Sequence, residues 1–260
     1  MTVSIRASLL FSAFAMAALT AAFANPPGED ASEPAHPKHW SYGGEGGPDH
    51  WSELAPENAS CSAGVQQSPI DLSGAMIATI DAPHPKWIPV RGGNVVNNGH
   101  TIQVDVGNAG GIRLSGVDYS LKQFHFHHPS EHTIDGKSFP LELHLVHASP
   151  GGKLAVIGVM FEAGPASEAL DSIWATAPGR EGKAAVAFEI DASKFLPKAA
   201  SAYRYEGSLT TPPCSETVSW TVMAEPQTAS AAQIAAFAEI FPWNARPIQP
   251  LNRRYVLRTP

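Results

Sequence analysis

Two histidine-rich stretches with strict two-residue alternation most constrain what this chain can fold into. In "QFHFHH" (residues 123–128) Phe124 and Phe126 alternate with Gln123, His125 and His127, and in "ELHLVH" (residues 142–147) Leu143 and Leu145 alternate with Glu142, His144 and Val146. Successive side chains of a β-strand point to opposite faces of a sheet, so this pattern predicts strands with one apolar face in the core. The face opposite the phenylalanines would carry Gln123, His125 and His127.

These strands can bring three imidazoles within reach of one ion. His125 and His127 would lie about 7 Å apart along one strand, and a neighbouring strand can place His144 beside them. Three histidines with a fourth position open form the catalytic zinc arrangement, unlike the closed four-ligand structural site. Gln123 and Glu142 stand where each could accept the second ring N–H of a ligating histidine. For an isolated H-x-H pair, the alternative is exposed sheet histidines without a metal.

The rest of the chain predicts a mainly β (α+β) fold. It would be a single domain on a large, mostly antiparallel central sheet with a few short peripheral helices. The high glycine and proline content, 22 and 23 residues, favours turns over long helices. Further strands are predicted at residues 101–106, 154–162, 187–190 and 217–223. Helices are predicted at residues 167–177 and from Ser230, where Ser230 and Gln233 form a capping box.

The beginning of the chain has the pattern of an export signal. Arg6 precedes an apolar run, and "AFA" at residues 22–24 fits a small-residue cleavage site, so residues 1–24 are predicted to be a signal peptide. The alternative is a membrane anchor, because the uncharged run is just long enough to span. Residues 25–38 are a Pro-rich polar linker, and residues 39–260 form the predicted domain. The location would be periplasmic or secreted.

Cys61 and Cys214 are the two cysteines of the chain. In an exported protein an isolated pair indicates one disulfide, and the alternative is two separate buried thiols. The formal net charge is −7, from 24 acidic and 17 basic residues. Because nucleic acids are bound largely through Lys and Arg contacts to phosphate, this balance argues against a nucleic-acid partner.

The sequence resembles the α-class carbonic anhydrases over the whole predicted domain. Motifs follow the family's order from "HWSYGGEGGPDHW" (39–51) through "QQSPIDL", "NNGH", "QFHFHHPSEH", "ELHLVH" and "GSLTTPPC" to "NARPIQPLNRR" (244–254). The resemblance implies an enzyme that catalyses zinc-dependent, reversible hydration of carbon dioxide to bicarbonate and a proton. It also implies no membrane partner after signal cleavage, and a monomer or homodimer.

The resemblance also implies roles for individual residues. Zn²⁺ would be bound by His125, His127 and His144, with Gln123, Glu142 and the backbone of Asn244 as partners of the ligands. Thr210 would orient the zinc-bound hydroxide and donate its own hydrogen to Glu131, and His100 would export the proton. The substrate pocket would be Val146, Val156, Leu209, Thr211 and Trp220, and the solvent network Tyr42, Asn98 and Gln103, where the family often has Asn in place of Gln103. Ser68–Pro69 and Pro212–Pro213 would be cis.

From the residues alone, other interpretations of these positions stay open. The pocket residues would be ordinary core, Thr210 a turn threonine, and His100 an exposed histidine after an Asn-Gly turn. The remaining histidines of the domain are expected to be structural or surface residues: His50, His84, His128, His132 and His147. The alternative function is a catalytically weak or silent carbonic-anhydrase-like binding domain. Such a domain would lack a ligand or block Thr210 or Glu131, and the sequence shows neither.

Overall fold

The computed structural model describes residues 39–80, 83–199 and 201–260. The predicted signal peptide (1–24) and linker (25–38) lie outside the described residues. Residues Pro37–Pro260 form one compact unit. Within the described part of the chain, no helix has the length and apolar character needed to cross a membrane.

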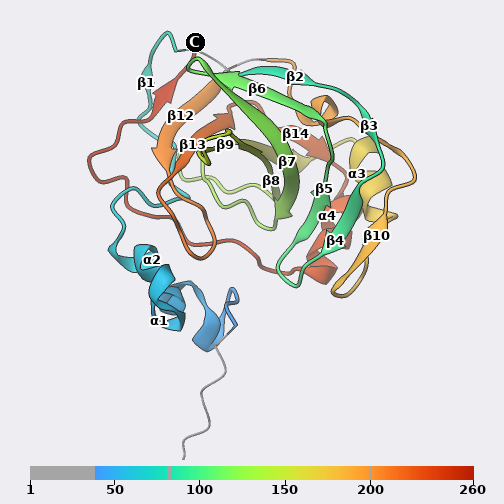
Figure 1. Cartoon of the computed structure of the whole chain (residues 1–260), viewed down its shortest axis with the longest axis horizontal. Helices are drawn as coiled ribbons and strands as arrows, with labels where there is room; N and C mark the ends of the chain where they lie inside the picture. The colour runs from blue at the N-terminus through green and yellow to red at the C-terminus, as the bar shows by residue number, and fades with distance from the viewer. Residues whose placement is uncertain (1–38, 81–82, 200) are drawn as a thin grey trace, which may run out of the picture. The chain divides into compact units, whose positions relative to one another are not determined.

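A large sheet dominates the fold, and Figure 1 shows its central strands passing through the middle of the domain. The strands are β1 Met76–Ile77, β2 His84–Trp87, β3 Val90–Arg91, β4 Asn94–Asn97, β5 Ile102–Asp105, β6 Gly110–Leu114, β7 Val117–His127, β8 Leu141–Ala148, β9 Leu154–Ala163, β10 Gly182–Ala185, β11 Glu189–Ile190, β12 Ala202–Gly207, β13 Val218–Met223, β14 Gln227–Ala229 and β15 Leu257–Arg258.

Among the described residues, thirteen strands form one sheet with the main order β1-β15-β12-β13-β9-β8-β7-β5-β4-β10. The pairs β1–β15, β13–β9 and β14–β9 are parallel, and the other pairs of this sheet are antiparallel. The predicted fold class is therefore confirmed. One prediction was partly wrong: within residues 187–190 only β11 is a strand, and it pairs with β3 in a separate two-stranded sheet.

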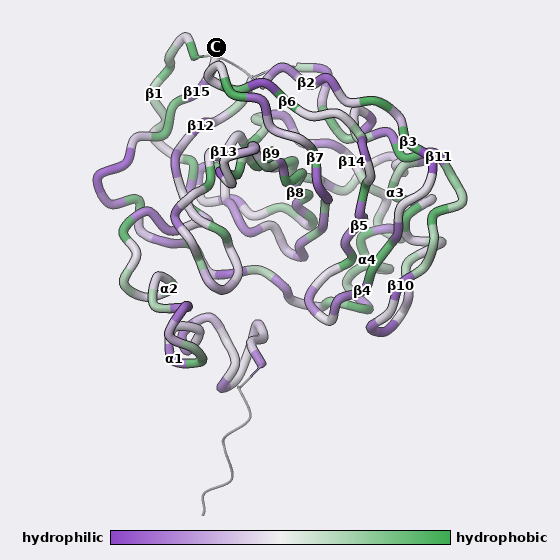
Figure 2. Tube along the Cα trace, in the orientation of Figure 1, coloured by the Kyte–Doolittle hydropathy of each residue, from purple (hydrophilic) through white to green (hydrophobic). Residues whose placement is uncertain are grey.

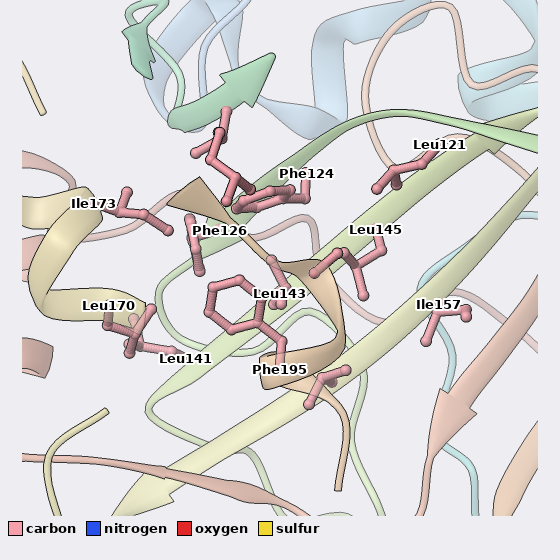
Figure 3. Close-up of a cluster of buried hydrophobic side chains, with 14 of the residues drawn as sticks. Leu121, Phe124, Phe126, Leu141, Leu143, Leu145, Ile157, Leu170, Ile173 and Phe195 are labelled. Carbon is pink, nitrogen blue, oxygen red and sulfur yellow. The ribbon is translucent and has the colours of Figure 1, made fainter. Parts of the chain in front are cut away.

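The two faces of the central strands differ as the alternation predicted. Phe124 and Phe126 of β7 are fully buried in the main hydrophobic cluster, together with Leu143 and Leu145 of β8. Figure 3 shows these side chains in one cluster with Leu170, Ile173 and Phe195. Figure 2 shows hydrophobic colour along β8 and β9, in keeping with a central position in the sheet. The opposite face of β7 and β8 is left to the histidines.

Two helices, α3 Glu168–Trp174 and α4 Ala231–Ile240, cover the phenylalanine face. The predicted capping box of α4 is present, with Ser230 accepting from the Gln233 amide and the Gln233 side chain accepting from the Ser230 amide. The same glutamine donates to the Ser167 carbonyl oxygen at 2.7 Å, so it ties the start of α3 to α4. Both helices were predicted, because each has a polar cap followed by apolar residues at helical spacing.

Short helices at the beginning of the domain were not predicted. They are α1 Trp51–Leu54 and α2 Ser60–Ala63, with 3₁₀ turns around them. Each spans about one turn, too short for a periodic pattern to show in the sequence. Tertiary contacts hold them: the buried Trp51 indole donates to the Ser41 and Gly46 carbonyl oxygens.

Cys61 of α2 and Cys214 form the predicted disulfide, with their Cα atoms 5.0 Å apart. Cys214 follows Thr210 by four residues, so the bond attaches the predicted catalytic loop to the first helices of the domain. The Ser68–Pro69 and Pro212–Pro213 bonds are cis as predicted, and His128–Pro129 is cis as well.

Candidate metal centre and active site

Three histidines meet on the polar face of β7 and β8. His125 lies directly opposite His144 in the strand register, and His127 is two residues further along β7. The ring centroids are 5.0 Å apart for His125–His127, 5.3 Å for His125–His144 and 4.5 Å for His127–His144. One nitrogen from each ring lies within 4.8 Å of the others, so the three form a metal-binding group.

Each ring has its other nitrogen occupied. The Nδ1 atom of His125 is 2.9 Å from Gln123 Oε1, and that of His127 is 2.7 Å from the Asn244 carbonyl oxygen. In His144 it is Nε2 that is bonded, 2.9 Å from Glu142 Oε1. Because these oxygens accept the ring N–H, the lone pairs remain on Nε2 of the first two rings and on Nδ1 of the third.

A metal ion fits this donor set. His127 Nε2 is buried and has no hydrogen-bond partner within the described part of the chain. An unsatisfied buried polar atom costs about 1–3 kcal/mol, which bonding to a metal would offset. Burial also lowers the pKa of His127 to about 4, and it lowers the pKa of His125 and His144 as well. The rings are therefore neutral at neutral pH, the form in which imidazole binds metals.

Glu142 is a buried carboxylate held by four donors. Its Oε2 accepts from the amides of Glu131 and His132 at 2.8 and 2.9 Å, and its Oε1 accepts from the rings of His132 and His144. Burial alone would raise the pKa of Glu142, but the charges and hydrogen bonds of the two histidines hold it well below the usual range. The ionised carboxylate thereby keeps the His144 ring in one tautomer and one orientation.

Sequence reasoning missed two supports of Glu142. His132 was expected only to be structural or at the surface. It is fully buried, and its ring bridges Glu142 and Tyr205: Nδ1 bonds Glu142, and Nε2 is 2.6 Å from the Tyr205 hydroxyl. Gly158 of β9 lies opposite His144, and a Cβ there would be 3.0 Å from Glu142 Oε1. In the sequence, the histidine of "PSEH" could have indicated the first of these two supports, His132. A glycine within an apolar strand indicates close approach of another group, but not which one.

Glu131 lies beside the metal-binding group. Its Oε1 accepts from the Arg246 amide at 2.9 Å, while its Oε2 is 3.5 Å from His127 Nε2 and 3.8 Å from His144 Nδ1. Burial raises the pKa of Glu131 to about 7, against the opposing effects of His144, the Arg246 amide and the Thr210 hydroxyl. The structure thus brings the predicted pair Thr210 and Glu131 together, next to two of the three histidines.

The arginine that supports Glu131 was not predicted to have a role. Arg246 is 3% exposed, and its guanidinium donates to the Gln67 side chain and to the Ser68 and Cys61 carbonyl oxygens. A buried guanidinium with three acceptors positions its own backbone amide firmly. Nothing in the linear pattern of "NARPIQPLNRR" separates this arginine from an exposed one.

Apolar side chains stand next to the histidines across the sheet. Val146, Val156 and Trp220 are in register on β8, β9 and β13, and Leu209 packs against the same cluster. The Trp220 and His144 ring centroids are 4.8 Å apart. Val156 and Trp220 are buried, whereas Val146, Leu209 and Thr211 are half-buried. The five predicted pocket residues therefore include three that stay partly accessible.

The three residues of the predicted solvent network have different contacts within the protein. Gln103 lies opposite His125 and donates to Asp105 at 2.6 Å, and Tyr42 has its pKa raised by burial and by the charge of Glu131. Asn98 has another task. Its Oδ1 accepts from the His100 and Thr101 amides, both at 3.0 Å, so this side-chain oxygen closes the turn that carries His100.

The backbone of His100 is held by hydrogen bonds at both its amide and its carbonyl oxygen, and its ring stacks on Trp40. Its carbonyl oxygen accepts from Asn244 Nδ2 at 2.9 Å, which connects the turn to the residue that also bonds His127. The imidazole is half-buried and lies parallel to Trp40, with ring centroids 3.6 Å apart. Burial lowers the pKa of His100, and the neighbouring His39 lowers it further.

This sheet carries a three-histidine metal-binding group beside Thr210, Glu131 and an apolar wall, which is the arrangement of three-histidine metalloenzymes. Residues 46–260 match the family model described as eukaryotic-type carbonic anhydrase. A carbonic anhydrase of Nostoc sp. is 45% identical over 225 residues, covering 84% of this chain and 85% of that protein. One from Pectobacterium carotovorum is 44% identical over 223 residues, covering 84% and 90%.

Solved structures agree with the sequence comparison. The α-carbonic anhydrase of Thermovibrio ammonificans, solved in complex with the inhibitor sulfanilamide, superposes with a TM-score of 0.82 at 43% identity, covering 84% of this chain and 98% of that one. The chain therefore belongs to the α-class, or eukaryotic-type, carbonic anhydrase family, and it is a carbonic anhydrase.

Proposed function

We propose that this chain binds Zn²⁺ through His125 Nε2, His127 Nε2 and His144 Nδ1 and uses it for the reversible hydration of carbon dioxide. The observation that carries the proposal is the set of three converging ring nitrogens whose partner nitrogens are already hydrogen-bonded. Zinc in such a site supplies a Lewis acid that brings the pKa of a water molecule to about 7, a value known for carbonic anhydrases as a class.

Thr210 and Glu131 would orient the nucleophile. In the protein without a metal, burial outweighs the opposing contacts and raises the pKa of Glu131 to about 7. A divalent cation among the histidines would place positive charge near Glu131 and favour its ionised form. An ionised Glu131 can only accept, so the Thr210 hydroxyl donates its hydrogen bond to Glu131 and keeps its proton. Thr210 is then left as an acceptor toward the nucleophile, which fixes the direction of the nucleophile's lone pair.

The half-buried apolar residues beside His144 would receive carbon dioxide. Val146 and Leu209 with Trp220 offer the molecule a surface without hydrogen-bond donors, adjacent to the metal-binding group. A linear, uncharged substrate is held there by dispersion contacts alone, which suits rapid exchange with the charged product. Thr211 would lie beside this apolar surface, and Tyr42, Asn98 and Gln103 would contact the water around the reaction.

The disulfide is consistent with export, because disulfides persist in oxidising compartments. We propose that residues 1–24 are removed as a signal peptide and that residues 39–260 act in the periplasm or outside the cell. A catalytically silent binding domain remains the second possibility from sequence, but no observation in the described residues favours it. A monomer or homodimer stays the predicted assembly.

Metal removal tests the proposal directly. We expect stopped-flow carbon dioxide hydration to fall to the buffer rate after dialysis against a chelator and to return when one equivalent of Zn²⁺ per chain is added. Zinc content is followed in parallel by elemental mass spectrometry. Undiminished hydration by protein shown to contain no metal would contradict the proposal.

His100→Ala tests the proposed exit of the proton. We expect kcat to fall in low buffer near pH 8 by up to about 10³-fold, because bare water accepts a proton from a group of pKa about 7 only about 10³ times per second, far below the turnover of about 10⁶ per second known for this class. The measured loss should be smaller than this ratio, because residual buffer and other water molecules take over part of the transfer. The value of kcat/KM should stay unchanged, since it reports the hydration step, and imidazole at tens of millimolar should restore kcat. An unchanged kcat in low buffer would make His100 a turn residue only.

A further inference from the structure

A second histidine lies against His100 at the surface. The imidazoles of His39 and His100 are parallel within 7°, with their centroids 5.0 Å apart. His39 is exposed, whereas His100 is half-buried and stacked on Trp40. A shuttle that is partly covered by a tryptophan has less contact with buffer than an exposed ring, so its exposed neighbour has the better access to solvent.

His39 also lies in a surface hollow that reaches the catalytic loop. The hollow has a volume of about 400 Å³ and is lined in part by His39, Trp40, Pro212 and Pro213. Pro212 and Pro213 directly follow Thr210 and Thr211 in the sequence. The exposed His39 thus lies in the same hollow as the two prolines that follow the proposed catalytic threonine.

We propose that His39 is a second proton-transfer residue, which takes the proton from His100 and passes it to buffer. This inference rests on the proposed role of His100. The transfer is balanced: protonated His100 becomes neutral, His39 becomes protonated, and a buffer base then removes that proton. Two stacked rings at this separation do not share a direct hydrogen bond, but one water molecule spans such a gap with two bonds of about 2.8 Å.

The hydrogen bonding of His39 suits an acceptor. Its Nδ1 is 2.9 Å from the Trp40 carbonyl oxygen, which can only accept, so the neutral ring carries its proton on Nδ1 and has its lone pair on Nε2. Protonation at Nε2 leaves the bond to the carbonyl in place. The ring can therefore gain and lose a proton without changing its orientation.

Electrostatics favours outward movement of a single proton. The charge of His39 lowers the pKa of His100, so the two rings do not hold two protons together without cost, and Glu181 acts in the opposite direction on His100. Glu57 lines the hollow with His39. Glu181 favours a cation on His100, and at physiological salt the influence of an exposed carboxylate fades beyond about 8 Å. A proton on exposed His39 also keeps its hydration, which a proton on His100 partly loses.

The test compares His39→Ala with His39→Lys, in low buffer near pH 8. We expect each to lower kcat about threefold without changing kcat/KM or zinc content, because partly exposed His100 can still reach buffer directly. Lysine carries a permanent positive charge at this pH and cannot accept a proton, since its pKa is about 10.4. His50→Ala, which removes another exposed histidine of the same segment, should leave kcat unchanged. In the His100→Ala background, His39→Ala should cause no further loss.

The outcomes separate this inference from the proposed function. If His100→Ala lowers kcat and His39→Ala does not, His100 works alone and the His39 relay is wrong. A rise in kcat with His39→Ala would overturn it too, because His39 would then act only through its charge on His100. A second readout is independent of turnover: the pH dependence of the His100 ring protons, followed by NMR. Loss of His39 should move the titration of His100 to higher pH. An unchanged His100 titration would show that the rings do not interact in solution, which would contradict the relay.

Discussion

Replacing His144 by alanine is expected to remove both the bound metal and the hydration of carbon dioxide. His144 Nδ1 is one of three nitrogens that converge on the proposed ion, and its Nε2 is fixed by Glu142. Loss of a hydrogen-bonded partner of a ligand typically costs about 10- to 100-fold in metal affinity, so loss of the ligand itself should cost more, at least about 10³-fold. Zinc content and stopped-flow hydration should fall together.

Gln123→Ala is the matched comparison. It leaves all three ligands and removes only the acceptor that orients His125, so zinc affinity should fall within the smaller range of about 10- to 100-fold. The thermal unfolding of both variants shows whether the sheet is intact. Full zinc content in folded His144→Ala would mean that the third ligand is another residue.

The second large effect is expected for Thr210→Ala. Thr210 is 5% exposed, and its loop is held by the Leu209–Ser215 and Cys214–Thr211 backbone bonds and by the disulfide. Alanine leaves these contacts in place and removes the hydroxyl between Glu131 and the nucleophile. Removal of one positioned hydrogen-bonding group in an active site typically costs about 10²–10³ in rate, so kcat/KM should fall about 10²-fold.

Thr210→Ser separates orientation from packing. Serine keeps the hydroxyl and loses a methyl group, so it should retain most of the activity that alanine loses. Zinc content should match that of the unsubstituted protein in both variants, because Thr210 is not a ligand. If serine and alanine are equally impaired, the methyl group rather than the hydroxyl is what the site requires.

The ligands and their strands could be predicted because they depend on local periodicity. In β7 and β8 every second side chain faces the core, so the phenylalanines and leucines determine which histidines face away. Alternation also predicted β5, a continuous apolar run with β-branched residues predicted β9, and the capping box predicted the start of α4. The family resemblance added Thr210, Glu131 and His100. Taken alone, Thr210 and His100 have the local sequence pattern of turn residues.

What the sequence by itself determined, then, was the set of strands, the face of each strand that carries imidazoles, and the family. Only the tertiary structure decided the strand register that sets His125 against His144, where a slip of one residue would turn one of them to the other face. It also decided that Asn98 closes a turn, that Arg246 supports Glu131, and that His39 lies against His100. These contacts join residues through packing and hydrogen bonds, which leave no period in the chain because the partners are far apart in sequence or lie on irregular segments.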